Sequence, residues 1–281
     1  MARTDAVTAN TQETVLDAPA PSLAHTLLWG FARVFSIVAL VVAWEGLARS
    51  GQFTPFVLPS LSSVIERIWS DAVSGDLAIN TGLTVYRAMV GFLISMVGGI
   101  LIGVAMSRSV IANWFFDPIV SVGFPMPKIA FLPVVILWLG VYDVSKITII
   151  VIDAIFPVIA ATLIAIRGVE KELIWSARNM GANNRELMWQ IVLPAALPQI
   201  LTGLQVALPI SMIVAVVAEM LMGGYGLGGA MMTASRFADS RGVFAGIVEI
   251  AIVGYVLIKA MSVLRRRLLI WHQEANEPTT A

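Results

Sequence analysis

The chain has 281 residues, of which 58% are hydrophobic and 13% charged, and its formal net charge is zero. A soluble domain is usually about 45–50% apolar and about 25% charged, so this composition indicates a polytopic membrane protein. The zero net charge gives no indication of nucleic-acid binding, and the absence of cysteine excludes disulfides and thiolate metal sites. Only His25 and His272 could supply imidazole, and both lie near the ends, so we expect no metal centre.

The first residues, 1–24, are polar and rich in Ala, Thr and Pro. They lack the basic start and apolar core of a signal peptide, so we expect a disordered N-terminal tail. The transmembrane domain is then expected to cover residues 25–272, and a short C-terminal tail residues 273–281.

Six segments contain the roughly 20 mostly apolar residues that a helix needs to cross a bilayer. They are roughly 27–48, 88–106, 118–140, 147–166, 199–222 and 243–264. The third contains four prolines, and irregular backbone at membrane depth is tolerated only where protein or water covers it. We therefore expect an all-α integral membrane protein with about six transmembrane helices, whose third segment faces the interior or the solute pathway.

The basic residues of the loops predict the orientation of these helices. With an even number of spans both termini share one side, and ten loop cations lie there: Arg3, Arg33, Arg108, Arg167, Lys171, Arg178, Arg185, Arg265, Arg266 and Arg267. The other side has six: Arg49, Arg67, Arg87, Lys146, Arg236 and Arg241. This asymmetry predicts a multi-pass membrane protein with both termini and residues 167–198 in the cytoplasm.

The predicted cytoplasmic segment 167–198 is amphipathic. Its pattern predicts one helix from Arg167 to about residue 180, ended by Gly181 in a left-handed conformation. Asn183 then suits an N-cap, with Glu186 placed for a capping box, and Pro194 is expected to end the second helix. The pair could also be no more than an interfacial amphipathic element.

The spacing A-x3-G followed by L-P-x3-P resembles the signature loop of inner-membrane permeases of binding-protein-dependent ABC importers. The matching residues are Ala177, Gly181, Leu193, Pro194 and Pro198. The family's loop opens with an acidic residue and two alanines, whereas this chain reads Trp175, Ser176, Ala177 there. Glu172 lies one turn earlier and is the candidate to replace the acidic contact.

Other segments resemble the nitrate/sulfonate/taurine branch of this family. They are VLPSLSSV (57–64), TVYRAMVGF (84–92), PMPKIAFLPVVILWLG (125–140), AEMLMGGYGLGGAM (218–231) and RRRLLIWH (265–272). The resemblance covers roughly residues 27–272. It implies a location in the cell inner membrane and the type I ABC importer permease fold, in which loop 167–198 docks into a groove on a cytoplasmic ATPase.

The resemblance also implies the partners: ABC ATPase subunits, an extracytoplasmic substrate-binding protein and a second permease copy, most simply as a homodimer in the lipid bilayer. The chain has no G-x-x-x-x-G-K-[ST] motif, so ATP is expected to bind only the partner subunit. We therefore expect a transport subunit without cofactor or enzymatic activity. Substrates of the branch are small anions such as sulfonates, taurine or nitrate, and also heterocyclic vitamin precursors.

Four charged residues fall in or near the spans, besides Lys128 among the prolines: Asp153, Glu219, Glu249 and Lys259. A charge at the bilayer centre costs about 2.5–3.5 kcal/mol, so such side chains are expected to face the bundle interior. Lys128, Asp153 and Glu219 are candidate pathway or gate residues. Asp153 could equally pair with Lys128, and Glu219 could anchor the glycine-rich turn that follows it.

Two different classes of function remain open at this stage. Asp153 and Glu219 would suit an ion-driven secondary transporter, although no internal repeat supports one. A membrane scaffold would gain nothing from the proline-broken third segment. Within the second segment Gly99 and Gly103 form a G-x-x-x-G pair, for which packing inside the chain is favoured over a dimer contact.

Overall fold

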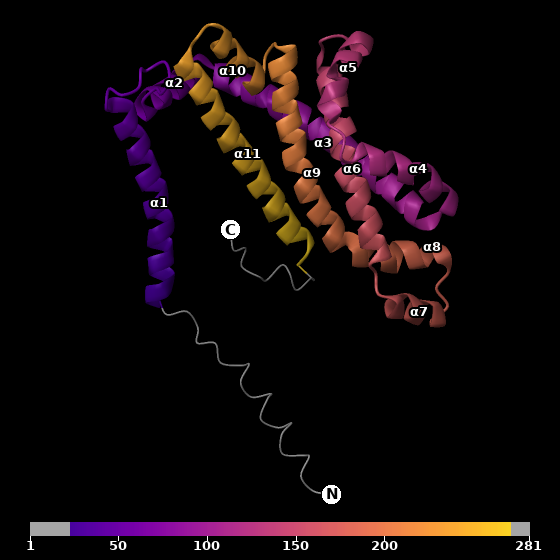
Figure 1. The fold of residues 1–281 in the computed structure, drawn as a ribbon. Coiled ribbons are helices and arrows are strands. Elements are labelled where there is room, and N and C mark those ends of the chain that lie inside the picture. The colour runs from indigo at the N-terminus through magenta and orange to yellow at the C-terminus, as the bar shows by residue number, and fades with distance from the viewer. Residues whose placement is uncertain (1–22, 271–281) are drawn as a thin grey trace, which may run out of the picture. The chain divides into compact units, whose positions relative to one another are not determined.

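The computed structural model describes residues 23–270, and every regular element among them is a helix (Figure 1). The chain divides into two compact units, residues 1–62 and 63–281, each of which is described by itself. The predicted tails 1–24 and 273–281 lie outside the described residues, except that Leu23 and Ala24 belong to the first helix.

The first unit contains helix α1, Leu23–Arg49, which covers the first predicted span. Glu45 near its end accepts hydrogen bonds from the backbone N–H of Leu61 (2.7 Å) and the hydroxyl of Ser62 (2.9 Å). Trp44 Nε1 donates to the carbonyl oxygen of Pro59 (3.0 Å). These bonds fold the segment that follows α1 back onto the helix end.

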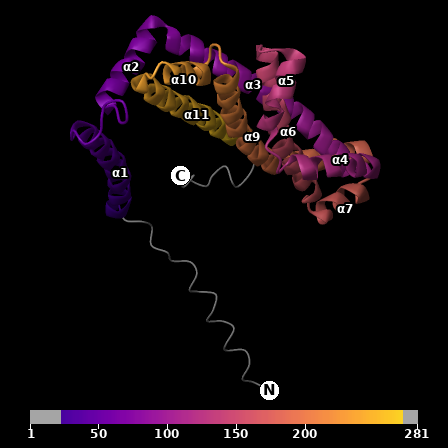
Figure 2. The same ribbon diagram turned by 45° about the horizontal axis from the view of Figure 1, so that its top comes forward.

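The second unit is built around three long helices that pack together: α3 (Asp76–Arg108), α6 (Asp143–Arg167) and α9 (Leu193–Met222). The other elements are α2 (Leu61–Ser74), α4 (Val110–Gly123), η1 (Lys128–Phe131), α5 (Leu132–Leu139), α7 (Lys171–Asn179), α8 (Asn184–Glu186), η2 (Leu187–Val192), α10 (Leu227–Arg236) and α11 (Ser240–Leu268). Figure 2 shows α10 beside α9 and α11, with which it packs.

Small residues allow α3 to lie directly on α6. A Cβ atom added at Gly99 would come within 2.7 Å of Val158, and one added at Gly103 within 2.7 Å of Thr162. Gly91 faces Ile150 in the same way. Close backbone approach of this kind is how small residues stabilise helix pairs in membranes, so the G-x-x-x-G pair serves packing within the chain, as expected.

Within residues 23–270, four helical runs are long and apolar enough to cross a membrane: α3, α6, the continuous run Asn184–Met222, and α11. The bent pair Val110–Gly123 and Lys128–Leu139 makes a fifth if it is counted as one span. The all-α membrane architecture is thus confirmed, while the count of six spans stays a prediction.

The third predicted span, residues 118–140, is broken at its prolines as expected, but its predicted start at residue 118 is wrong. Helix α4 already begins at Val110, ends at Gly123, and is bent by 95° from the run Lys128–Leu139. The physical reason lies in Pro125 and Pro127, which have no N–H to donate and disfavour helical backbone at the residue before them.

The prediction that Pro194 ends a short second helix is also wrong. The helix that starts at Asn184 passes through the π-helical turn η2 and continues without a break to Met222, so Pro194 lies in the first turn of α9. A proline ring clashes with the carbonyl four residues earlier in an α-helix, and the wider π turn before it relieves this clash. The first helix is shorter than expected, because α6 runs to Arg167 and α7 begins only at Lys171.

Candidate functional site

The segment predicted to bind a partner, residues 167–198, is here called the coupling block. Gly181 has φ +89° and closes the C-terminus of α7 with two hydrogen bonds. Its own N–H donates to the carbonyl oxygen of Arg178 (2.9 Å), and the N–H of Ala182 donates to that of Ala177 (3.1 Å). This is the Schellman arrangement that favours glycine. A Cβ at Gly181 would meet no atom within 4 Å, so only the backbone conformation requires glycine there.

A capping box begins the next helix two residues later. The Asn183 side-chain oxygen accepts from the backbone N–H groups of Arg185 (2.9 Å) and Glu186 (3.0 Å). In return Glu186 Oε2 accepts from the N–H of Asn183 (2.9 Å). The two caps together fix the direction in which the chain leaves α7 and enters α8.

The inner side of the coupling block is attached to two membrane helices. One buried cluster contains Ala177 of α7, residues of η2, and the ends of α6 and α9: Ala165, Ile166, Leu187, Met188, Val192, Ala196 and Ile200. Ala177 is only 3% exposed. A displacement of the coupling block therefore acts on α6 and α9 through close-packed side chains.

The outer side of the coupling block presents large apolar side chains. Met180 is 81% exposed, Trp189 63% and Trp175 57%, and Leu173 is also exposed. Clusters of large exposed apolar side chains mark candidate interaction sites. These side chains lie on α7, on η2 and at the turn between the two helices, which Figure 1 shows at the ends of α6 and α9 opposite α10.

The remaining predicted residues of the coupling block differ in their surroundings. Glu172 is exposed in the first turn of α7. Leu193 packs against the buried cluster, Pro194 is exposed and Pro198 is buried inside α9. Glu172 is therefore accessible to a partner, whereas Pro198 contributes to packing.

Lys128 and Asp153 form an ion pair with 3.0 Å between Nζ and Oδ1. Lys128 is buried, donates to the carbonyl oxygen of Phe124 (2.9 Å) and lies 5.0 Å from the ring centre of Phe156. The lysine is thus neutralised by a carboxylate of α6 and fixes the irregular segment between α4 and α5 to that helix.

Glu219 is completely buried and belongs to a second charged network. Arg87 Nη1 of α3 donates to Glu219 Oε1 (2.6 Å), and the Thr84 hydroxyl donates to Oε2 (2.8 Å). The backbone N–H of Gly228 also donates to Oε2 (3.1 Å). The opposite side of Arg87 pairs with Asp143 (2.7 Å). The three candidate pathway residues therefore form two separate ion pairs.

The glycine turn after α9 folds closely around this carboxylate. Gly223, Gly224 and Gly226 all have positive φ, and a Cβ at Gly226 would collide with the Glu219 carboxylate. Lys146 Nζ donates to the carbonyl oxygen of Gly223 (2.9 Å). Helices α3, α6 and α9 are thereby joined to one turn at the end opposite the coupling block.

Sequence reasoning missed the partners of Glu219. The sequence places Arg87 and Lys146 among the loop cations, yet they are 4% and 3% exposed. A signal was present in the segment TVYRAMVGF, because Thr84 and Arg87 are three residues apart and share one helix face. A buried carboxylate requires donors of this kind.

Comparisons with known proteins identify the family of this chain. Residues 95–270 match the family described as binding-protein-dependent transport system inner membrane component. The taurine transport system permease protein TauC of Escherichia coli is 31% identical, over 86% of this chain and 90% of that protein. SsuC of Bacillus subtilis, named provisionally as an aliphatic sulfonates transport permease, is 33% identical over 86% of this chain and 88% of its own length.

A relative with a different named substrate and a solved structure complete the comparison. The riboflavin transport system permease protein RibX of Chloroflexus aurantiacus is 29% identical, over 84% of this chain and 88% of that protein. A structure of the MetNI methionine ABC transporter in inward-facing conformations matches with a TM-score of 0.55 at 19% identity, covering 74% of this chain and 96% of that chain. The chain therefore belongs to the binding-protein-dependent transport system inner membrane component family, and it is a permease subunit of an ABC importer.

Proposed function

We propose that the coupling block docks on a separate cytoplasmic ATPase subunit and transmits its movement to the permease core. The observation that supports this is the exposed apolar surface of Trp175, Met180 and Trp189, on a block whose inner side packs against α6 and α9. A soluble partner would cover this surface, and every shift of the partner would reach both helices.

The proposed cycle uses no covalent chemistry on this chain. ATP closes the partner ATPase dimer and draws the coupling blocks of two permease copies together. Helices α6 and α9 follow, and the pathway opens to the side where an extracytoplasmic binding protein delivers solute. Hydrolysis resets the assembly. The sequence supports a separate ATPase, because it contains no phosphate-binding loop.

For the substrate we propose a small sulfonate-type anion such as taurine. Support comes from the relatives named for taurine and aliphatic sulfonates. Lys128 adds nothing to this choice, since Asp153 neutralises it. A heterocyclic vitamin or vitamin precursor is the second candidate, because a relative of similar identity is named for riboflavin. Competition between taurine and riboflavin for uptake distinguishes the two.

The coupling proposal is tested by comparing Gly181→Val with Gly181→Asn. Left-handed backbone costs an ordinary L-residue roughly 1–2 kcal/mol, and asparagine tolerates it better than valine. This strain would displace the turn between α7 and α8, so we expect Gly181→Val to lose most of the ATPase stimulation by the loaded binding protein. Gly181→Asn should stay near the original activity.

Membrane insertion should be unchanged in both variants, because Gly181 lies outside the spans. The measurement is ATPase activity of the purified complex with and without loaded binding protein, beside a pull-down of the ATPase. If Gly181→Val couples and associates as the original chain does, the block is only an interfacial helix pair.

A further inference from the structure

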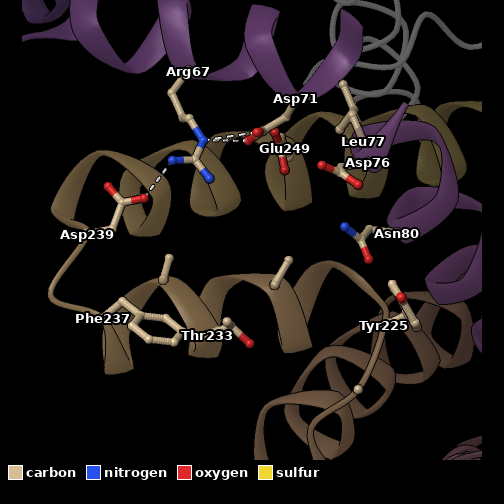
Figure 3. A pocket seen from close by; sticks show the side chains of 13 residues that line it. Arg67, Asp71, Asp76, Leu77, Asn80, Tyr225, Thr233, Phe237, Asp239 and Glu249 are labelled. Atoms are coloured by element: carbon tan, nitrogen blue, oxygen red, sulfur yellow. Dashed lines mark hydrogen bonds and ion pairs between the residues drawn. The ribbon is translucent and has the colours of Figure 1, made fainter. Parts of the chain in front are cut away.

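A cavity of about 470 Å³ is lined by residues of α2, α10 and α11 (Figure 3), at the end of the second unit away from α7 and α8 (Figure 1). Its walls come from α2, the start of α3, the glycine turn, α10 and the first turns of α11. The proposed coupling function does not use this cavity.

The charged side chains of the cavity are mostly acidic. Arg67 pairs with Asp71 (2.9 Å) and with Asp239 (2.6 Å), as the dashed lines in Figure 3 show. Asp239 also caps α11 by accepting from the N–H of Gly242 (3.0 Å). Asp76 and Glu249 line the cavity as well, so the lining holds four acidic side chains and a single guanidinium group. The cavity has a negative charge excess that suits a cation.

Glu249 is the acidic residue of the cavity that lacks a hydrogen-bond donor within residues 23–270. The residue is only 8% exposed, and its Oε1 atom is buried without a hydrogen-bond partner among the described residues. Burying a carboxylate oxygen without a partner is costly, so such an atom requires a donor. The neighbouring donor, Arg67, is already shared between Asp71 and Asp239.

The form of the cavity favours an organic cation over a metal ion. In residues 23–270, no group of three or more His, Cys, Asp or Glu side chains converges as a metal site would need. The remaining walls include Leu77 and two aromatic side chains, Tyr225 and Phe237. An alkylammonium group donates hydrogen bonds to a carboxylate, and its methylene carbons pack against such walls.

We propose that this cavity binds an alkylammonium group through Glu249. The group has two possible sources, an amine-bearing solute such as taurine or a lysine side chain of the docked binding protein. The first source would refine the proposed substrate to an amino-sulfonate. Amine binding is measured without transport or ATP, so its failure is distinguishable from failure of the coupling proposal.

The first test uses the full chain in lipid nanodiscs and n-propylammonium chloride as the probe, with saturation-transfer NMR as the readout. We expect binding of propylammonium but not of 1-propanol, and at least a tenfold loss of affinity in Glu249→Gln, which keeps the shape and removes the charge. Asp117→Asn makes the same change in net charge at an exposed position on α4 and should bind as the original chain does.

The second test identifies the source of the amine by measuring affinity for the binding protein. Unchanged docking of Glu249→Gln, with lost amine binding, assigns the site to the solute. A tenfold weaker docking assigns it to a side chain of the binding protein. No propylammonium signal from the original chain, or equal loss in Asp117→Asn, overturns the proposal whatever the docking result.

Discussion

At the residue scale, Glu219 joins parts of the chain that are far apart in sequence. It receives hydrogen bonds from Thr84 and Arg87 of α3 and from Gly228 in the turn after α9. Removing one partner of a buried ion pair usually costs more than the pair itself contributes, because the other charge remains buried. Glu219 is therefore expected to matter for stability even if no solute touches it.

We predict that Glu219→Ala destabilises the permease by about 3–5 kcal/mol, because Arg87 and the Gly228 N–H lose their buried acceptor. Glu219→Gln should cost less, since an amide oxygen still accepts one or two of these bonds. Thermal unfolding of the purified protein in detergent measures both. A double-mutant cycle compares Arg87→Met, Glu219→Met and the variant that carries both changes. The double variant should lose less stability than the sum of the losses of these two single variants. Additive losses would show that the two side chains act independently.

At the element scale, the contact between α3 and α6 depends on the absence of side chains on one face of α3. The glycines of that face could be assigned to packing from their spacing alone, and the capping box at Asn183 could be read from the sequence as well. The glycine spacing and the capping box each involve residues that are close together in the sequence, so the sequence alone predicts them.

Two other elements could not be read in this way. Pro194 lies inside a continuing helix because a π turn precedes it. No residue pattern in 187–192 predicts that turn. The partners of Glu219 come from α3, 132 and 135 residues earlier in the chain. Such pairings depend on which helices pack side by side, and hydrophobic periodicity carries no information about this choice.

We predict opposite effects for alanine at two glycines of α3. Gly82→Ala meets open space and should stabilise by roughly 0.4–1 kcal/mol through a less flexible unfolded chain. Gly99→Ala places its Cβ 2.7 Å from Val158 and should destabilise by about 1–3 kcal/mol through overpacking. Unfolding temperatures in one detergent compare them directly. Equal shifts would mean that α3 and α6 separate easily.

At the scale of the whole molecule, the loop charges predict the orientation in the membrane. Arg87 and Lys146 were counted on the outer side, but both are buried and bonded within the helix bundle. They are therefore not free loop cations, and the excess of basic residues on the side of the termini is larger than the sequence suggested.

We predict that single cysteines at Ser70 and Ser235 react with an impermeant thiol reagent added outside intact cells. A cysteine at Asn184 should react only after the membrane is opened. All three positions are exposed, and the chain has no native cysteine to obscure the result. Labelling of Asn184 in intact cells would reverse the orientation and place the coupling block outside.

The unbroken helical run from Asn184 to Met222 has a mechanical consequence. Its 39 residues correspond to a rod about 58 Å long at 1.5 Å per residue, roughly twice the thickness of the hydrocarbon core. The rod carries Trp189 at one end and Glu219 at the other. Pro198 and Pro209 inside the run have no N–H to donate, so we expect bending to concentrate at these prolines and at the π turn. A push on the end that carries Trp189 would thus reach the ion pair of Glu219 along the helix axis, less whatever bending the π turn and the two prolines absorb.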